Sequence, residues 1–225
     1  MTAKRFSENL REDAAHIWEK IFAHPFLTGI GEATLPLDKF KFYVKQDYTY
    51  LVDFARCLGL AAAKAEDIET MQTLATLLKA GTTIEIEMLE GLGERLGITA
   101  EKLRNTEPAP TNVAYMRHFL YVAYSGSVGE IMASMLPCMW TYQGIGERMK
   151  GGPAFDGHPF YKEWRDTYRS REYVELVDWY RSLTDRYASE AGPRERELMR
   201  EHFLLSSRYE YMFWDMAYNK EIWPV

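Results

Sequence analysis

The stretch FKFYVKQDYTYLVDFARCLGL, residues 40–60, decides the fold because its large apolar side chains recur every three or four positions. That spacing gathers them on one face of an α-helix, whereas a half-buried strand alternates with a period of two. Asp47 interrupts the pattern, because it shares the face with five large side chains: Phe40, Tyr43, Tyr50, Phe54 and Leu58. A carboxylate among such neighbours needs dedicated partners. We expect Asp47 either to serve a site or to hydrogen-bond a neighbouring tyrosine for structure alone.

The same helical period continues along nearly the whole chain, with no sustained alternation of period two. Pro-containing or Gly-containing stretches at 105–112 and 150–159 interrupt it, and the His24-Pro25 step ends the first run. The sequence therefore predicts an all-α bundle of roughly seven or eight helices in a single domain over residues 1–225. The expected helices cover 7–23, 38–64, 67–96 with a weak break near Gly81, 111–124, 127–149, 159–168, 171–189 and a long last run that begins at Pro193.

Three helix starts carry a capping signal. Asp38 and Thr111 are expected N-caps, since their side-chain oxygens can accept an amide hydrogen bond of the first turn. Ser127 with Glu130 has the spacing of a capping box.

The composition limits the function classes. The 225 residues include 27 Lys and Arg against 33 Asp and Glu, a formal charge of −6 that is spread along the chain. Nucleic acid and anionic membranes are poor partners for such a surface. The N-terminus lacks an apolar signal core, and no stretch approaches the roughly 20 apolar residues of a membrane span. We expect a cytoplasmic protein in which Cys57 and Cys138 are free thiols.

One of these thiols directly follows a proline in SMLPCMWTY, residues 134–142. Pro137 cannot donate an amide hydrogen bond and crowds the preceding turn, so we expect a kink just before Cys138 that opens space beside the thiol. Cys138 lies on a helical face with Ile131, Met135, Tyr142, Ile145 and Met149. A buried cysteine is more often an inert small hydrophobe than a nucleophile, and from the pattern alone both readings stay open.

A second acid stands on an apolar stripe near the C-terminus. Glu210 shares a helical face with Met199, Phe203, Ser206, Phe213 and Ala217, whereas Glu201 and Asp215 fall off that face and are expected in solvent. A partly buried Glu favours its neutral form, which suits a general acid, although structural burial is an alternative.

Metal and cofactor patterns are weak. Asp13 and His16 have the spacing of half a di-iron site, but no second pair completes it, and a lone His16 as a haem ligand stays a rival reading. Zinc, nucleophile-elbow and phosphate-loop motifs are absent. We expect no metal and no cofactor.

Four blocks together resemble the TenA family, the class II thiaminases: YVKQDYTYLVDFA at 43–55, SGSVGEIMASMLPCMWTYQGIGE at 125–147, HPFYKEWRDTY at 158–168 and LSSRYEYMFWDMAYNKEIWP at 205–224. The LPC block is similar to that of the cysteine-containing branch. The resemblance implies a haem-oxygenase-like helical bundle, assembled as a homotetramer. It also implies an aminopyrimidine aminohydrolase of thiamin salvage, which converts 4-amino-5-aminomethyl-2-methylpyrimidine to the hydroxymethylpyrimidine, with thiamin as a further substrate.

The resemblance also implies roles for individual residues. Cys138 resembles the nucleophile, Asp47 the carboxylate that holds the amino group and ring nitrogen of the pyrimidine, and Glu210 the group that moves protons at the leaving group. Four tyrosines resemble the residues that contact the substrate ring: Tyr50 and Tyr142 as a sandwiching pair, Tyr115 as a lining residue, and Tyr168 near the ring and the cysteine. A pyrimidine-binding or regulatory protein without hydrolysis is the alternative.

Overall fold

The computed structural model describes residues 4–225, and the fold is 82% helical with no strand among these residues. The predicted all-α class is confirmed. None of the described helices combines the length and the apolar character that crossing a bilayer requires. The chain groups into two compact units: unit 1 comprises the residues up to Leu35 with Met132–Asp215, and unit 2 comprises Pro36–Ile131 with Met216–Val225. One domain over 1–225 stays a prediction.

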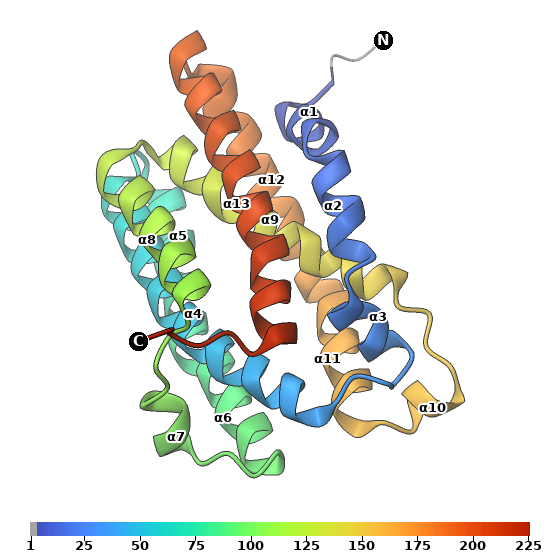
Figure 1. The fold of residues 1–225 in the computed structure, drawn as a ribbon. Coiled ribbons are helices and arrows are strands. Elements are labelled where there is room, and N and C mark those ends of the chain that lie inside the picture. Colours follow the sequence, from blue (N-terminus) through green and yellow to red (C-terminus); the bar gives the residue numbers. More distant parts are fainter. Residues whose placement is uncertain (1–3) are drawn as a thin grey trace. The chain divides into compact units, whose positions relative to one another are not determined.

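Unit 1 begins with three short helices and continues with the helices of the second half of the chain. Figure 1 shows α1 alongside α12, and α11 also packs against α12. Its elements are α1 (Phe6–Asp13), α2 (Ala15–Phe22), α3 (Pro25–Gly31), most of α9 (Val128–Arg148), α10 (Pro153–Asp156), α11 (Pro159–Arg169), α12 (Arg171–Glu190) and α13 (Pro193–Asn219) as far as Asp215.

Unit 2 is organised around its longest helix, α4. Helices α5 and α8 both pack along α4, and α6 and α7 contact it as well (Figure 1). The elements are α4 (Leu37–Lys64), α5 (Ile68–Ala80), the π-helical turn η1 (Gly81–Glu85), α6 (Ile86–Arg95), α7 (Ala100–Arg104) and α8 (Pro110–Ser125). The π-turn occupies the position where the sequence predicted a break near Gly81.

Several predicted ends are confirmed in detail. Helix α4 ends at Lys64 and α13 begins at Pro193. The capping box is present, because Glu130 N donates to Ser127 Oγ and Ser127 N donates to the Glu130 carboxylate, both at 3.2 Å. Each of these ends follows from a local signal that needs no tertiary partner.

Other predicted ends are wrong. The first helix is divided at Ala14, whose backbone at φ −87° and ψ 0° leaves the helical region. Asp38 is not an N-cap: Pro36 holds that position, and Asp38 lies in the first turn, where it binds Lys220. Thr111 is not an N-cap either, because Ala109 precedes a helix that starts with Pro110.

Three short helices were not predicted: α3, α7 and α10. Each is too short to show a 3.6-residue period. Two of them start at a proline, whereas the sequence predicts a helix end at Pro25 and a turn around Pro153.

The core of each unit is rich in aromatic rings. In unit 1, Trp18 stacks on Phe203 at 6.0 Å between centroids and donates its indole N–H to Ser207 Oγ at 3.0 Å. In unit 2, Phe40 stacks on Tyr43 at 5.8 Å. Burying one such ring stabilises the fold by about 1.5–3 kcal/mol. The stripe first seen in residues 40–60 is therefore a core stripe, in which Phe40, Tyr43, Tyr50 and Leu58 are buried.

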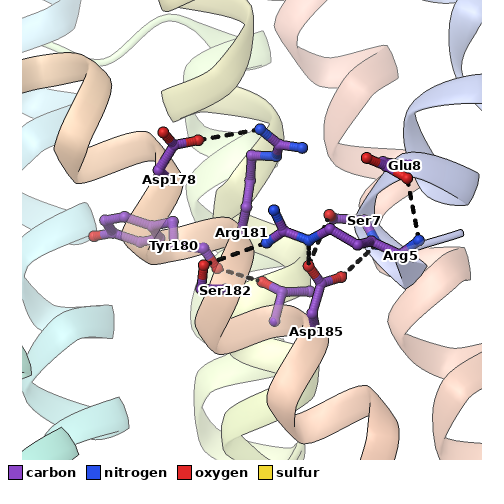
Figure 2. A network of polar contacts seen from close by, with 9 residues as sticks. Arg5, Ser7, Glu8, Asp178, Tyr180, Arg181, Ser182 and Asp185 are labelled. Atoms are coloured by element: carbon purple, nitrogen blue, oxygen red, sulfur yellow. Dashed lines mark hydrogen bonds and ion pairs between the residues drawn. The ribbon is translucent and has the colours of Figure 1, made fainter. Parts of the chain in front are cut away.

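The N-terminus of α1 is held by a carboxylate from α12. Figure 2 shows Asp185 facing Arg5 and Ser7, where it accepts hydrogen bonds from Ser7 N at 2.6 Å and Ser7 Oγ at 3.0 Å. Arg5 Nε donates to the same carboxylate at 2.6 Å. Asp185 thus satisfies an amide at the start of the helix, where the helix dipole favours a negative charge.

Candidate active site

The candidate nucleophile and the candidate proton-transfer acid both belong to unit 1. Cys138 follows Pro137 inside α9 and is 9% exposed, whereas Glu210 on α13 is 2% exposed. Thr141, one turn after Cys138, links them: its hydroxyl lies 3.3 Å from Glu210 Oε2 and 3.3 Å from the Cys138 carbonyl oxygen. Glu210 is therefore separated by one hydroxyl group from the turn that carries the thiol.

The burial of Glu210 agrees with its place on the apolar stripe of the last helix. Glu201 and Asp215 are exposed, as their positions off that stripe indicate. Asp215 still has a partner, since its carboxylate lies 3.7 Å from Nε2 of the buried His24. A charge as deeply buried as Glu210 requires hydrogen-bond donors, and Thr141 is one of them.

Tyrosine and tryptophan rings gather near this part of unit 1. Tyr142 packs edge-on against Tyr168 at 4.7 Å and lies 5.2 Å from Trp214. Trp164 contacts Tyr168 at 4.9 Å. Tyr173 touches Tyr168 at 5.1 Å and donates its hydroxyl hydrogen to the carbonyl oxygen of Met139, the residue after the thiol. Two predicted ring residues, Tyr142 and Tyr168, therefore lie in direct contact.

Unit 2 carries the remaining predicted residues. Asp47 on α4 is half-buried and accepts a hydrogen bond from the Tyr43 hydroxyl at 3.4 Å. This is the tyrosine contact that the structural reading of Asp47 requires, and it leaves a binding role open. Tyr50 lies 5.6 Å from Tyr115, and Tyr115 packs against Phe119 at 4.6 Å.

The two cysteines are free thiols in different surroundings. Cys57 on α4 is fully buried, and burial, reinforced by the negative charge of Asp53, raises its pKa to about 12. Cys57 therefore stays protonated near neutral pH and is a poor nucleophile. Cys138 is also buried, but 9% of it stays exposed, and its carbonyl oxygen accepts a hydrogen bond from the Thr141 hydroxyl.

The structure groups the predicted residues by unit. Unit 1 brings Glu210 to the turn of Cys138 and Tyr142 to Tyr168, and unit 2 brings Tyr50 to Tyr115. The predicted pair Tyr50 and Tyr142 belongs to different units, so the sandwich stays a prediction. The kink at Pro137 also stays a prediction, because the helix continues through this residue.

Two further features lie outside the predicted set. A cavity of about 660 Å³ in unit 2 is lined by Lys45, Gln46, Lys102, Trp223 and their neighbours, and it contains none of the predicted residues. Asp13, the acid of the half di-iron pattern, accepts a hydrogen bond from Arg200 Nε at 2.6 Å. Across residues 4–225, no three His, Cys, Asp or Glu side chains gather in a way that could hold a metal ion.

Sequence reasoning missed Thr141, Trp164, Tyr173 and Trp214. Thr141 stands on the same helical face as Cys138, but a threonine inside a helix most often bonds a carbonyl of its own previous turn. The contact that gives it significance joins α9 to Glu210, 69 positions away in the chain. A spacing rule cannot reveal such a contact.

Known proteins resemble this chain over almost its full length. The TENA/THI-4/PQQC family model matches residues 11–220. The aminopyrimidine aminohydrolase of Halalkalibacterium halodurans is 43% identical over 218 residues, covering 97% of each protein. A TenA homologue from P. horikoshii OT3 superposes with a TM-score of 0.88 at 37% identity, covering 96% of this chain and 99% of the homologue.

A more distant structure shows the fold class alone. A domain of unknown function with a haem-oxygenase-like fold, from Shewanella denitrificans, has a TM-score of 0.76 at 12% identity and covers 98% of this chain and 94% of its own. The predicted haem-oxygenase-like bundle is confirmed. With the family model spanning nearly all of the sequence and relatives well above 30% identity, this chain belongs to the TENA/THI-4/PQQC family.

Proposed function

We propose that this chain is an aminopyrimidine aminohydrolase of thiamin salvage, an enzyme that hydrolyses C–N bonds. Its substrate is 4-amino-5-aminomethyl-2-methylpyrimidine, which takes up water and releases ammonia to give the 5-hydroxymethyl product. The relatives named aminopyrimidine aminohydrolase support this class of reaction. The observation that carries it is the buried Glu210 carboxylate joined through Thr141 to the turn of Cys138.

The first step is a covalent addition. The Cys138 thiolate forms an S–C bond with the ring carbon next to the carbon that bears the methylene group, and a ring nitrogen takes up a proton. This addition ends the aromaticity of the ring. Asp47 holds the amino group and ring nitrogen, and its negative charge stabilises the protonated ring that accepts the thiolate. A soft, strong nucleophile suits this step, and Cys138 is the thiol of the chain that is not fully enclosed.

The second step breaks the C–N bond. Electrons of the ring expel the amine as Glu210 gives it a proton, which leaves an exocyclic methylene carbon. Water adds to that carbon and gives a proton back to Glu210, so the carboxyl group ends in its starting state. Loss of the thiolate then breaks the S–C bond, the ring nitrogen releases the proton that it took up in the first step, and the aromatic ring is restored. The net change is one water in and one ammonia out.

The aromatic residues orient the flat substrate. Tyr50 and Tyr142 stack on the ring, Tyr115 lines its position, and Tyr168 contacts both the ring and the cysteine region. Each aromatic contact contributes about 0.5–1.5 kcal/mol beyond burial of its area. The contact of Tyr142 with Tyr168 at 4.7 Å supports a shared role for these two residues.

We extend the proposal to the assembly, the compartment and a second substrate. We expect a homotetramer in the cytoplasm, with a small-molecule ligand, no cofactor and no nucleic-acid partner. Thiamin is a further substrate, cleaved at the same methylene carbon. Light scattering of the purified protein measures the number of subunits. Steady-state rates with thiamin and with the aminomethylpyrimidine show whether thiamin is a substrate.

The decisive test is ammonia release from the aminomethylpyrimidine by the purified full chain. We expect release that matches hydroxymethylpyrimidine formation mole for mole and that a thiol alkylating reagent abolishes. Tight binding of the product with no release of ammonia would instead favour a pyrimidine-binding or regulatory protein. Activity that requires added haem or iron would favour redox chemistry at His16.

A further inference from the structure

Thr141 is a buried hydroxyl between two groups of the proposed reaction. It is fully buried on α9, where its Oγ1 lies 3.3 Å from the Cys138 carbonyl oxygen and 3.3 Å from Glu210 Oε2. The first contact is local to the helix, whereas the second reaches α13 within unit 1. Val would fill the same volume without either hydrogen bond.

The hydroxyl of a threonine carries one proton and two lone pairs. When Glu210 is ionised, that proton is directed either to the carboxylate or to the Cys138 carbonyl. When Glu210 is protonated, its own O–H can donate to Thr141 Oγ1, and Thr141 then donates to the Cys138 carbonyl. The arrangement of hydrogen bonds at the cysteine turn therefore depends on whether Glu210 holds its proton.

We propose that Thr141 is a positioning residue that fixes the Glu210 carboxylate and connects it to the backbone of the Cys138 turn. The role in catalysis rests on the proposed function, but the contact itself does not. A hydroxyl that donates to a buried carboxylate favours its ionised form. Thr141 thereby sets how readily Glu210 takes up and returns the proton that the leaving amine requires.

The chain offers a matched control in Thr184. This residue is also fully buried in a helix of unit 1, and its Oγ1 donates to the Tyr180 carbonyl oxygen at 2.8 Å. Thr141→Val and Thr184→Val each remove one buried threonine hydroxyl, but only the first removes a contact to Glu210. Thr141→Ser keeps the hydroxyl and serves as the rescue variant.

The first readout is the pH dependence of kcat/KM for the aminomethylpyrimidine. Cys138, on the facing turn, is also a titratable group and can contribute a limb to the pH profile. The limb that belongs to Glu210 is therefore identified first, as the one that Glu210→Gln abolishes. We expect Thr141→Val to move this limb to higher pH by about one unit, a tenfold change in proton affinity, and Thr141→Ser to restore it. Thr184→Val leaves the limb in place.

The second readout needs no turnover. In protein labelled with ¹³C at the Glu carboxyl carbon, the Glu210 signal is the one missing from Glu210→Gln, and its titration midpoint rises in Thr141→Val alone. A raised midpoint without any aminopyrimidine turnover would refute the proposed function and leave the contact intact. Unchanged midpoints in Thr141→Val would overturn the inference. Circular dichroism checks the fold, and Thr141→Ala takes the place of Thr141→Val if the latter does not fold.

Discussion

Unit 1 and unit 2 hold the acids of the candidate site differently. Unit 1 buries Glu210 next to the Thr141 hydroxyl of a facing helix, and it also buries His24 and Arg165 with hydrogen-bond partners nearby in the chain. Unit 2 leaves Asp47 and Asp53 half-exposed on α4. A buried charge is tolerated only with partners, and burial changes its affinity for protons. In the proposed reaction, the groups that break the C–N bond are therefore buried ones, whereas Asp47, the proposed partner of the ring, is half-exposed.

The largest expected effect separates the two thiols. Cys138→Ala removes the proposed nucleophile, so we expect kcat for ammonia release to fall by about 10³-fold or more. Cys57→Ala removes a sulfur whose raised pKa keeps it protonated, and activity should stay within a fewfold of the parent. Near-normal turnover by Cys138→Ala would falsify its assignment as nucleophile and would remove the contrast between the units.

The second effect concerns the proposed binding of the pyrimidine by Asp47. It compares substitutions of two acids on α4. Asp47→Asn replaces a charged acceptor by a neutral amide, so we expect hydroxymethylpyrimidine to bind about 10- to 100-fold more weakly by calorimetry. Asp53→Asn is the matched control, because Asp53 pairs with Arg56 on the helix surface. Equal affinities of the Asp47 variant and the parent would contradict the binding role and favour a structural role, such as the hydrogen bond from Tyr43.

The third effect compares the carboxylates that satisfy helix starts in the two units. Asp185 accepts from Ser7 N, Ser7 Oγ and Arg5, whereas Glu221 accepts from Thr111 N at 2.9 Å. We expect Asp185→Asn to lower the free energy of unfolding by about 1–2 kcal/mol and Glu221→Gln by about 0.5 kcal/mol. Urea unfolding followed by circular dichroism measures both. A larger loss in the Glu221 variant would contradict the ranking.

The smallest effect concerns pH and the buried His24. Burial lowers its pKa below the ordinary value, and the negative Asp215 opposes this in part. His24 Nδ1 accepts from Phe26 N at 3.1 Å at the start of α3, which requires the neutral ring. The unfolded chain binds the proton more tightly, so stability is complete above about pH 6.5 and declines as pH falls below it.

His24→Asn keeps an acceptor for Phe26 N but cannot titrate. We expect the free energy of unfolding of the parent to drop by on the order of 1 kcal/mol more than that of this variant between pH 7 and pH 5. Urea unfolding at both pH values gives the comparison. Parallel losses in the two proteins would show that other groups cause the acid sensitivity.

How far the sequence predicts this fold depends on how its prolines are interpreted. The sequence predicts a helix start at Pro193, and α13 begins there. Pro25, Pro110 and Pro153 also open helices, whereas the sequence predicts a helix end at Pro25 and loops around the other two. A proline is an ambiguous signal in a sequence, since it ends a helix that precedes it and also suits the first turn of a helix that follows it. The residues after the proline decide whether a helix starts there, and a short helix has too few of them to show a helical period.

The residues of the candidate site likewise fall into those that local spacing predicts and those that it does not. Asp47, Cys138 and Glu210 stand out because a polar group interrupts an apolar stripe, which is a local signal. Thr141 and Tyr173 do not stand out, because their partners are a carboxylate and a carbonyl brought by chain segments far away in sequence. Local spacing predicts which groups are buried, whereas packing decides which of them meet.

The bond between Ser7 and Asp185 also has a consequence for how the protein is made. The two residues are 178 positions apart, so a ribosome that has exposed the first helix must add most of the polypeptide before the carboxylate emerges. At typical elongation speeds this interval is on the order of ten to thirty seconds. During this interval the start of α1 lacks its hydrogen bonds to Asp185. A nascent chain that stalls before residue 185 would keep that helix end without them.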